Sequence, residues 1–312
     1  MRVYRDISET KYDINTALTL GTFDGVHLGH RQLFSLLKQQ AAKDNLRTFV
    51  ITFDPHPRAV LLPHNQLPVL TTTDEKLRLF EQAGIDAVLV IKFTQEFANV
   101  SSEDFLKDYL LKSIGLRSLV VGYDFRFGRG RRGDAAMLKD FAQSEGFSFT
   151  SVPEFKKDDV TVSSSLIRGF LTQGRADLAN EYLGYRFSFC GKVVEGNKRG
   201  RTLGFPTANI DVSDKQKLIP GNGVYAVKVE GKNISRGGVM NIGVRPTFNE
   251  EPVVLAEVHL IDFDADIYGE QLCIYPFVKI RDEKKFTSVD ELKLQIESDR
   301  QTATQMLKNL SF

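Results

Sequence analysis

The first part of the chain alternates short apolar runs with segments in which apolar residues recur every three or four positions. The apolar runs predict strands at four places: residues 16–21, 47–53, 85–93 and 117–122. The helical spacing between them predicts three helices: residues 28–43, 71–84 and 101–115. The second helix opens with Thr72 and Glu75 in the spacing of a capping box. Repeated strand–helix–strand units predict a parallel α/β sheet with helices on both faces.

The pattern changes after two short helical segments that end near residue 184. Glycine-punctuated, β-rich segments follow without intervening helices, which predicts a small antiparallel β-barrel. An amphipathic helix over residues 288–310 closes the chain, with an apolar stripe through Ala303 and Leu310. The predicted fold is α/β plus β, with one domain over residues 1–184 and a second over residues 185–312.

Composition predicts a folded protein of two domains, because 312 residues include 42% hydrophobic and 26% charged side chains. No apolar run approaches the roughly 20 residues of a membrane-spanning helix, and the polar N-terminus does not resemble a signal peptide. The two cysteines, Cys190 and Cys273, are too few for a disulfide framework or a four-thiolate zinc site. We therefore expect a cytoplasmic protein that does not act at a membrane.

The charge balance argues against nucleic acid as a partner. Residues 1–184 hold 23 basic and 23 acidic side chains, the remainder hold 18 and 17, and the net charge is +1. Basic residues nevertheless gather in RFGRGRR (126–132) and NKRGR (197–201), beside glycines. Such runs are either solvated loops or segments that bind phosphate, and the sequence leaves both interpretations open.

The first candidate site is the stretch LTLGTFDGVHLGH, residues 18–30. A strand that ends near Gly21 leads into a helix, so backbone N–H groups and the positive helix end lie near His27 and His30. Histidines three positions apart share a face of the first turn, and both imidazoles can reach one anion. A metal site would need a third ligand, for which Asp24 alone is weak support. We predict a phosphate site; a chance pair of surface histidines is the alternative.

Three motifs then carry a family resemblance. GTFDGVHLGH, VVGYDFRFGRGRRGD and VSSSLIRGFL, in this order, resemble bacterial FAD synthetases, which are Rossmann-like nucleotidyltransferases. The resemblance implies that the phosphate of FMN attacks the α-phosphorus of ATP, with catalysis by positioning and charge. It implies catalytic roles for His27, His30 and Arg168. It also implies a set of binding residues: Gly21, Phe23, Asp24, Gly29, Asp124, Ser163 and Ser164. For the last motif, a serine-capped helix with a surface arginine is the alternative.

The second candidate site is GKVVEGNKRGRTLGFPTANI, residues 191–210. Pro206 favours an extended chain around it, and extended backbone places Thr207 and Asn209 on one side with Ala208 on the other. A hydroxyl and an amide oxygen suit Mg²⁺ when phosphates complete the octahedron. A proline turn with ordinary polar side chains is the alternative.

A glutamate further along the chain adds a candidate base. In LAEVHLIDF, residues 255–263, alternation puts Glu257, His259 and Ile261 on one strand face. If that face turns toward the barrel interior, we expect burial to raise the pKa of Glu257 and suit it to general-base catalysis. An exposed glutamate paired with a lysine is the commoner arrangement.

GFPTAN, GVYAV, NIGVRPTF and ExHLIDF together resemble riboflavin kinases, over nearly all of residues 185–312. The resemblance implies that Glu257 takes the proton from the ribityl 5′-hydroxyl of riboflavin as it attacks ATP, and that Thr207 and Asn209 hold Mg²⁺. It also implies a set of nucleotide-binding residues: Gly191, Lys192, Gly204, Phe205 and Pro206. The sequence holds no GxxxxGK[ST] motif, so this would be phosphoryl transfer without a P-loop.

The two halves together resemble the family of bacterial bifunctional riboflavin kinase/FAD synthetases, with riboflavin, FMN, FAD and ATP as the expected small-molecule partners. Three alternatives differ from this hypothesis: a different adenylyl acceptor for the first domain, nucleic-acid binding through RFGRGRR and the barrel, and a flavin-binding module without catalysis. The sequence leaves self-association into a homo-oligomer open.

Overall fold

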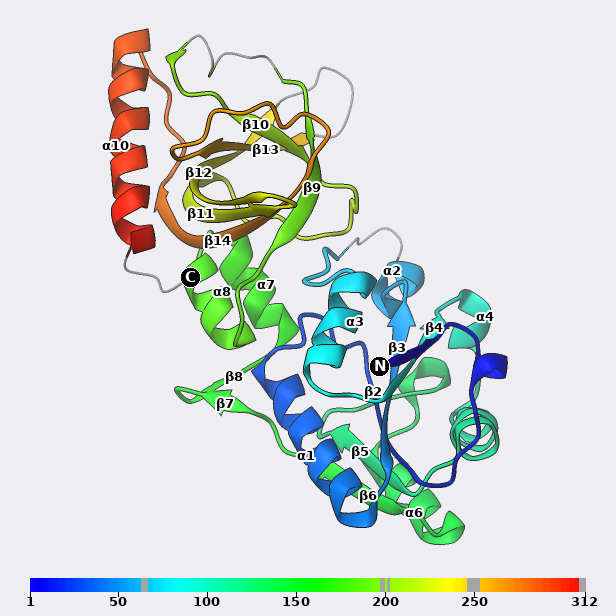
Figure 1. The fold of residues 1–312 in the computed structure, drawn as a ribbon. Helices are drawn as coiled ribbons and strands as arrows, with labels where there is room; N and C mark the ends of the chain where they lie inside the picture. Colours follow the sequence, from blue (N-terminus) through cyan, green and yellow to red (C-terminus); the bar gives the residue numbers. More distant parts are fainter. Residues whose placement is uncertain (63–66, 197–199, 201–202, 246–252, 309–312) are drawn as a thin grey trace. The chain divides into compact units, whose positions relative to one another are not determined.

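The computed structural model describes residues 1–62, 67–196, 200, 203–245 and 253–308 (Figure 1). The chain forms two compact units, Met1–Ser164 and Ser165–Phe312. These units are defined by how compactly their residues pack, not by their activities. The predicted boundary at residue 184, which concerns activity, stays a prediction.

The first unit is built on a six-stranded sheet in the order β1-β4-β3-β2-β5-β6, with every pair of neighbours parallel. The strands are β1 (Arg2–Tyr4), β2 (Thr16–Leu20), β3 (Arg47–Asp54), β4 (Ala87–Lys92), β5 (Ser118–Gly122) and β6 (Ser148–Val152). The four predicted strands and their parallel arrangement are confirmed. The two edge strands were missed because β1 has only three residues and β6, SFTSV, has no apolar run.

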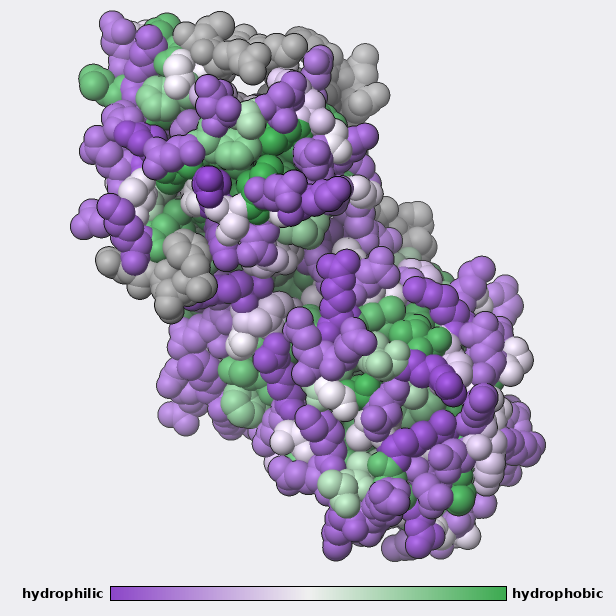
Figure 2. All heavy atoms as spheres, viewed as in Figure 1, coloured by the Kyte–Doolittle hydropathy of each residue, from purple (hydrophilic) through white to green (hydrophobic). Residues whose placement is uncertain are grey.

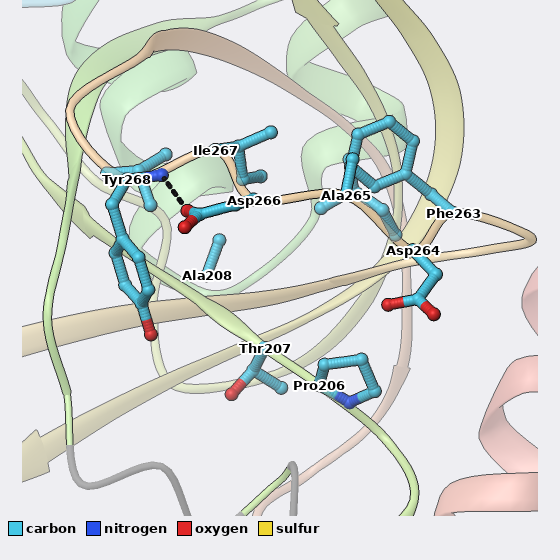
Figure 3. Close-up of a pocket in the computed structure, with 11 residues that line it drawn as sticks. Pro206, Thr207, Ala208, Phe263, Asp264, Ala265, Asp266, Ile267 and Tyr268 are labelled. Atoms are coloured by element: carbon cyan, nitrogen blue, oxygen red, sulfur yellow. Dashed lines mark hydrogen bonds between the residues drawn. The ribbon is translucent and has the colours of Figure 1, made fainter.

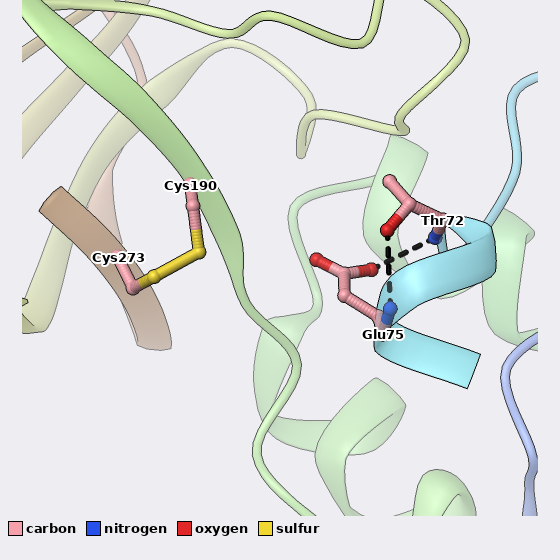
Figure 4. Close-up of a disulfide and its surroundings, with 4 residues drawn as sticks. All are labelled: Thr72, Glu75, Cys190 and Cys273. Carbon is pink, nitrogen blue, oxygen red and sulfur yellow. Dashed lines mark hydrogen bonds between the residues drawn. A yellow bond between two sulfur atoms is a disulfide. The ribbon is translucent and has the colours of Figure 1, made fainter. Parts of the chain in front are cut away.

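The helices of this unit confirm the three predicted ones and add others. They are η1 (Ile7–Glu9), α1 (Leu28–Asp44), α2 (Pro57–Leu61), α3 (Thr73–Gln82), α4 (Gln95–Ala98), α5 (Ser102–Asp104), η2 (Phe105–Ile114), η3 (Arg129–Arg131) and α6 (Ala135–Glu145). The predicted third helix divides into α5 and η2, which is a π-helix. A two-stranded hairpin of β7 (Lys156–Lys157) and β8 (Val160–Thr161) follows. The capping box of α3 forms as predicted (Figure 4).

Apolar side chains of the sheet point away from both of its faces. One core cluster joins alternate sheet residues such as Leu18 and Ile51 to Leu110 of η2 and Leu138 of α6. The other joins the intervening sheet residues to α1 and α3 and includes the fully buried Phe80. Because both faces of this parallel sheet are buried, a ligand site is expected at the ends of the strands, where the loops lie.

The second unit is a closed antiparallel barrel, as predicted (Figure 1), and its strand order is β10-β13-β12-β11-β14-β9. Its strands are β9 (Phe189–Val194), β10 (Ala208–Asp211), β11 (Gly223–Gly231), β12 (Ile234–Arg245), β13 (Val253–Leu260) and β14 (Gln271–Arg281). Its helices are α7 (Ser164–Thr172), which begins at the boundary, α8 (Ala176–Leu183) and α10 (Val289–Lys308).

The terminal helix α10 packs on the barrel through Ala303 and Leu307. Ala303 belongs to the predicted stripe, whereas Leu310 lies outside the described residues. Asp299 of α10 is also buried, and its carboxylate accepts hydrogen bonds from the Arg281 guanidinium at 2.7 and 3.0 Å. A paired, hydrogen-bonded charge can be tolerated at such a buried position.

Cys190 of β9 and Cys273 of β14 are direct cross-strand neighbours and form a disulfide (Figure 4). Sequence analysis considered only a framework of several disulfides and so missed this single pair. The two residues are 83 positions apart, and only the barrel register brings them together.

None of the helices in the described residues is long and apolar enough to span a membrane. On the face seen in Figure 2, hydrophilic residues predominate and hydrophobic ones form small, separated patches.

Candidate active sites

The predicted histidines lie where β2 leads into α1. The loop after Leu20 leaves the carboxyl end of a central strand, and α1 begins at Leu28 with His27 as its N-cap residue. The imidazoles of His27 and His30 stack with their centroids 3.6 Å apart and their planes inclined by 18°. The structure thus brings both rings together at the positive end of a helix.

The environment of His30 favours a neutral ring. Burial is the largest cause that lowers the pKa of His30 well below its usual value, and the nearby His27 and Lys76 lower it further. The Nδ1 atom of His30 is buried and has no hydrogen-bond partner among the described residues. A buried polar atom left in this way is suited to a ligand that supplies the missing partner.

The loop before the histidines has an unusual backbone that buried contacts hold in place. Phe23 and Val26 have positive φ angles of 48° and 38°, although neither is glycine. The buried carboxylate of Asp24 accepts hydrogen bonds from the amides of Leu70 at 3.1 Å and Thr71 at 3.0 Å. Asp24 therefore anchors the loop to the segment before α3.

Two predicted glycines leave room for aromatic rings in this loop. A Cβ on Gly21 would lie 3.0 Å from the Phe23 ring, and one on Gly29 would lie 3.3 Å from the His27 ring. Both contacts are tight for a methyl group, so a side chain at either position would press on the ring. The small size of both glycines helps to set the positions of Phe23 and His27.

The third motif reaches the first through a serine. Ser164, the first residue of α7, donates its hydroxyl hydrogen bond to the Asp24 carbonyl at 2.8 Å, and Ser163 precedes it half-buried. Arg168 lies one turn along α7, within the second unit, and is only 8% exposed. The alternative of a surface arginine on this helix is therefore wrong.

The second motif is more exposed. Asp124 lies two residues beyond the end of β5 and is exposed. In the RFGRGRR segment, Arg126 pairs with Asp134 at 2.9 Å, and the arginines at 129, 131 and 132 are exposed. Both segments follow the carboxyl end of β5, the neighbour of β2 in the sheet.

The second candidate site lies on three neighbouring strands of the barrel. Glu257 of β13 stands opposite Asn209 of β10 on one side and Asn241 of β12 on the other. The three side chains are half-buried, whereas Ala256 and Val258 are buried. The register therefore lines up a carboxylate between two amides on one face of the sheet.

Two expectations about this strand are wrong. Glu257 does not face the barrel interior, because the apolar residues that flank it in the strand occupy that side. Ile261 does not share its face, because β13 ends at Leu260 and Ile261 packs with α10.

The described glycines of the preceding loop pack directly on the predicted magnesium ligands. A Cβ on Gly196 would overlap the side-chain amide of Asn209. A Cβ on Gly200 would overlap the carbonyl of Phe205 and lie 3.1 Å from the Thr207 hydroxyl oxygen. Most of the NKRGR segment, residues 197–199 and 201–202, lies outside the described residues.

A histidine that was not predicted as a site residue fixes the GFP turn. The Nδ1 atom of His259 lies 2.8 Å from the Pro206 carbonyl, which makes it the donor, and the His259 ring meets the Phe205 ring edge-on. The sequence placed His259 on the face of Glu257, which is confirmed, but alternation could not show this partner.

A pocket of about 640 Å³, including its open mouth, lies beside Thr207 (Figure 3). Pro206 and Thr207 line one side, and the loop between β13 and β14 lines the other. That loop contributes Phe263, Asp264, Ala265, Asp266, Ile267 and Tyr268. The space that a water-sized molecule can occupy within it is about 70 Å³, which makes it a small, open recess.

The other predicted nucleotide-binding residues lie near these elements. Gly191 packs against the Asp211 backbone so closely that a Cβ would overlap its carbonyl, and the adjacent Lys192 is exposed. Gly204 is exposed, with a φ angle of 89° that favours glycine.

The donor set beside the pocket suits one type of metal. Within the described residues there is no cluster of three His, Cys, Asp or Glu side chains that could hold a metal ion. Thr207 and Asn209 instead offer two neutral oxygens. Mg²⁺ is commonly held by only one or two protein ligands with water and phosphate oxygens, so the pair fits that ion.

Two family models match the chain. The FAD synthetase model matches residues 9–166, and the riboflavin kinase model matches residues 183–307. The bifunctional riboflavin kinase/FMN adenylyltransferase of Escherichia coli (strain K12) is 41% identical over 287 residues, covering 92% of this chain and 91% of its own. The protein of the same description from Bacillus subtilis (strain 168) is 37% identical over 300 residues, covering 95% and 93%.

One solved structure is similar over nearly the whole chain. It is described as a macrolide-efflux protein from Streptococcus pneumoniae, is 30% identical, covers 99% of both chains and has a TM-score of 0.89.

Proposed function

Because the chain belongs to the family of bifunctional riboflavin kinase/FMN adenylyltransferases, we propose how its two candidate sites divide the two reactions. The enzyme phosphorylates riboflavin to FMN and adenylylates FMN to FAD, using ATP in both steps. The observation that carries this conclusion is the pair of family matches, FAD synthetase over residues 9–166 and riboflavin kinase over residues 183–307. The order of the sites along the chain is the reverse of the order of the reactions.

In the adenylyltransferase site, His27 and His30 bind the phosphates of ATP. The phosphate oxygen of FMN bonds to the α-phosphorus, and the bond from that phosphorus to the pyrophosphate breaks. Support comes from the stacked rings at the start of α1, the lowered pKa of His30 and its buried Nδ1 atom. A neutral imidazole at His30 can donate a hydrogen bond as negative charge moves onto the leaving pyrophosphate.

The remaining residues of this site have positioning and binding roles in the proposal. Gly21, Phe23 and Gly29 shape the loop around the histidines. Ser163, Ser164 and Arg168 receive pyrophosphate, since a helix start and a guanidinium both favour such an anion. Asp124 is assigned the role of holding the flavin or the ribose.

In the kinase site, Glu257 is the general base. Its carboxylate takes the proton of the riboflavin 5′-hydroxyl while that oxygen attacks the γ-phosphorus of ATP. Support comes from the register that sets Asn209 and Asn241 beside it, since the two amides can orient the carboxylate and the substrate hydroxyl.

Thr207 and Asn209 would hold Mg²⁺, which supplies neutralisation of the phosphate charge when bound. The pocket beside Thr207 is the proposed place for the nucleotide. Gly191, Lys192, Gly204, Phe205 and Pro206 complete the nucleotide-binding set.

We assign the protein to the cytoplasm, where ATP is available. In that reducing compartment the Cys190–Cys273 pair would be held as thiols, because cytosolic disulfides are rare. Quantification of thiols after rapid denaturation of protein from cells measures which form prevails.

Replacing Glu257 by Gln should lower FMN formation by about 10²- to 10⁴-fold, the usual contribution of a general base. The isosteric side chain keeps the strand register, so conversion of FMN to FAD should stay near the wild-type rate. Chromatography of the flavins from riboflavin, ATP and Mg²⁺ over time measures both steps. Glu230→Gln, in a half-buried glutamate of β11, is the control. Equal loss of both reactions in a folded Glu257→Gln protein would contradict the assignment.

Replacing both His27 and His30 by Ala should cause FMN to accumulate from riboflavin. FAD formation should fall by at least about 10²-fold, because hydrogen-bond donors to the developing charge are lost. The same flavin separation measures this, and His56→Ala, in the N-cap of α2, is the matched control. An unchanged rate of FAD formation would remove the histidines from the site.

Gly196→Ala should raise the Mg²⁺ and ATP concentrations needed for riboflavin phosphorylation, because the new methyl group displaces Asn209. FAD formation from supplied FMN should be unaffected. Gly169→Ala, where a Cβ meets nothing within 4 Å, is the control. Wild-type dependence of the kinase on Mg²⁺ in Gly196→Ala would exclude Asn209 as a ligand.

A further inference from the structure

Lys76, in the first turn of α3, is a buried cation to which neither reaction has yet assigned a role. Its side chain is only 6% exposed. Its ammonium donates to the Thr22 carbonyl at 3.0 Å, to the Thr52 hydroxyl at 3.1 Å and, more weakly, to the Phe53 carbonyl at 3.4 Å. An ammonium has three N–H donors, and three oxygens take them. Lys76 therefore has no donor left for a substrate, which makes it a positioning residue at most.

The first of these contacts reaches into the adenylyltransferase loop. Thr22 lies between Gly21 and the strained Phe23, in the segment that leads to the histidines. A trans peptide directs its C=O and N–H to opposite sides, so a Thr22 carbonyl held by Lys76 turns the Phe23 amide away from the ammonium. The Thr52 hydroxyl also donates to the Thr22 carbonyl, at 3.2 Å, so both groups converge on one oxygen.

The buried charge does not serve stability. Desolvation is the largest influence and lowers the pKa of Lys76 to about 8, against the opposing effects of Asp24 and Asp54. A lysine with a lowered folded-state pKa costs folding free energy at neutral pH, and that cost declines only as pH rises through about 8 toward the usual value. A neutral side chain of similar length would avoid the cost, so a functional reason for the ammonium is needed.

The charged groups around Lys76 suggest that reason. The carboxylates of Asp24 and Asp54 favour its charged form, whereas His30, beside His27, is held neutral partly by Lys76 itself. The lysine thus supplies positive charge near the His30 ring, and the His30 imidazole is left as a neutral donor.

We propose that Lys76 is a positioning residue of the adenylyltransferase site, which fixes the Thr22 carbonyl and at neutral pH supplies a positive charge for the triphosphate of ATP. The inference rests on the proposed binding of ATP phosphates at His27 and His30. It adds a contact from α3 itself, Lys76 to Thr22, to the hydrogen bonds by which Asp24 ties the GTFDG loop to the amides of residues 70–71.

The test uses full-length Lys76→Met, which removes the charge at similar length, and Lys76→Arg, which keeps it. Lys38→Met is the matched control, an exposed lysine of the same unit that bonds one carbonyl. Initial rates of FAD formation are measured with ATP and FMN varied from pH 6 to about 9.5, together with riboflavin phosphorylation and thermal unfolding.

For Lys76→Met we expect kcat/KM for ATP in FAD formation to fall about tenfold to hundredfold, as loss of a nearby charge predicts. The KM for FMN and riboflavin phosphorylation should stay near wild type, and the unfolding temperature should be unchanged or higher. In the wild type, kcat/KM for ATP should decline above about pH 8 as Lys76 loses its proton. That decline should be absent in Lys76→Met, and Lys76→Arg should recover part of the ATP dependence.

Two results would overturn the proposal. One is wild-type kcat/KM for ATP with an unchanged alkaline decline in Lys76→Met. The other is a lowered unfolding temperature with parallel loss of both activities, which would make Lys76 a purely structural residue. Failure of the proposed function is distinguishable, because then the wild-type protein itself would form no FAD from FMN and ATP.

Discussion

The hydrogen-bonded register of β10, β13 and β12 is the constraint on which the kinase site depends. It sets Asn209, Glu257 and Asn241 across one another on neighbouring strands, with buried Ala256 and Val258 on the opposite face. A slip of one residue would turn the carboxylate into the core and bring apolar side chains to the site. Closure of the barrel opposes such a slip, because every strand is paired on both edges. The same interactions that hold the barrel together thus position the proposed base.

The adenylyltransferase site depends on a different kind of support. A loop between a strand and a helix has no inter-strand hydrogen bonds to fix its backbone, and this one includes residues with positive φ. Hydrogen bonds of buried polar groups fix it instead. The carboxylate of Asp24 binds the amides of residues 70–71, and Ser164 and Lys76 bind loop carbonyls. Such groups are expensive to bury unless they are satisfied, so the loop has one well-determined conformation. The two sites are therefore preorganised by register and by buried hydrogen bonds respectively.

A feature of the fold could be predicted where neighbouring residues in the sequence determine it. The apolar runs of β2, β3, β4 and β5 and the cap at Thr72 are local signals, and they were predicted. Strand β6 was missed because three of its five residues are polar and its two apolar residues are not adjacent, and its place at the sheet edge requires no apolar run.

The errors at the sites are errors about tertiary surroundings. Alternation showed that Glu257 and His259 share a face but not which face meets the core, although the apolar residues that alternate with them, Ala256, Val258 and Leu260, were a usable signal. No pattern in the sequence indicates that Lys76 is buried, since a lysine in the first turn of a helix is ordinarily exposed. Cys190 and Cys273 meet only through the barrel register.

The central claim is that one chain carries two separate sites, with Glu257 serving one and His27 with His30 serving the other. The most direct measurement mixes the Glu257→Gln protein with the His27→Ala/His30→Ala protein and supplies riboflavin, ATP and Mg²⁺. Neither protein alone should convert riboflavin to FAD, whereas the mixture should produce FAD after a lag in which FMN accumulates. A mixture of folded variants that forms no FAD would contradict the account.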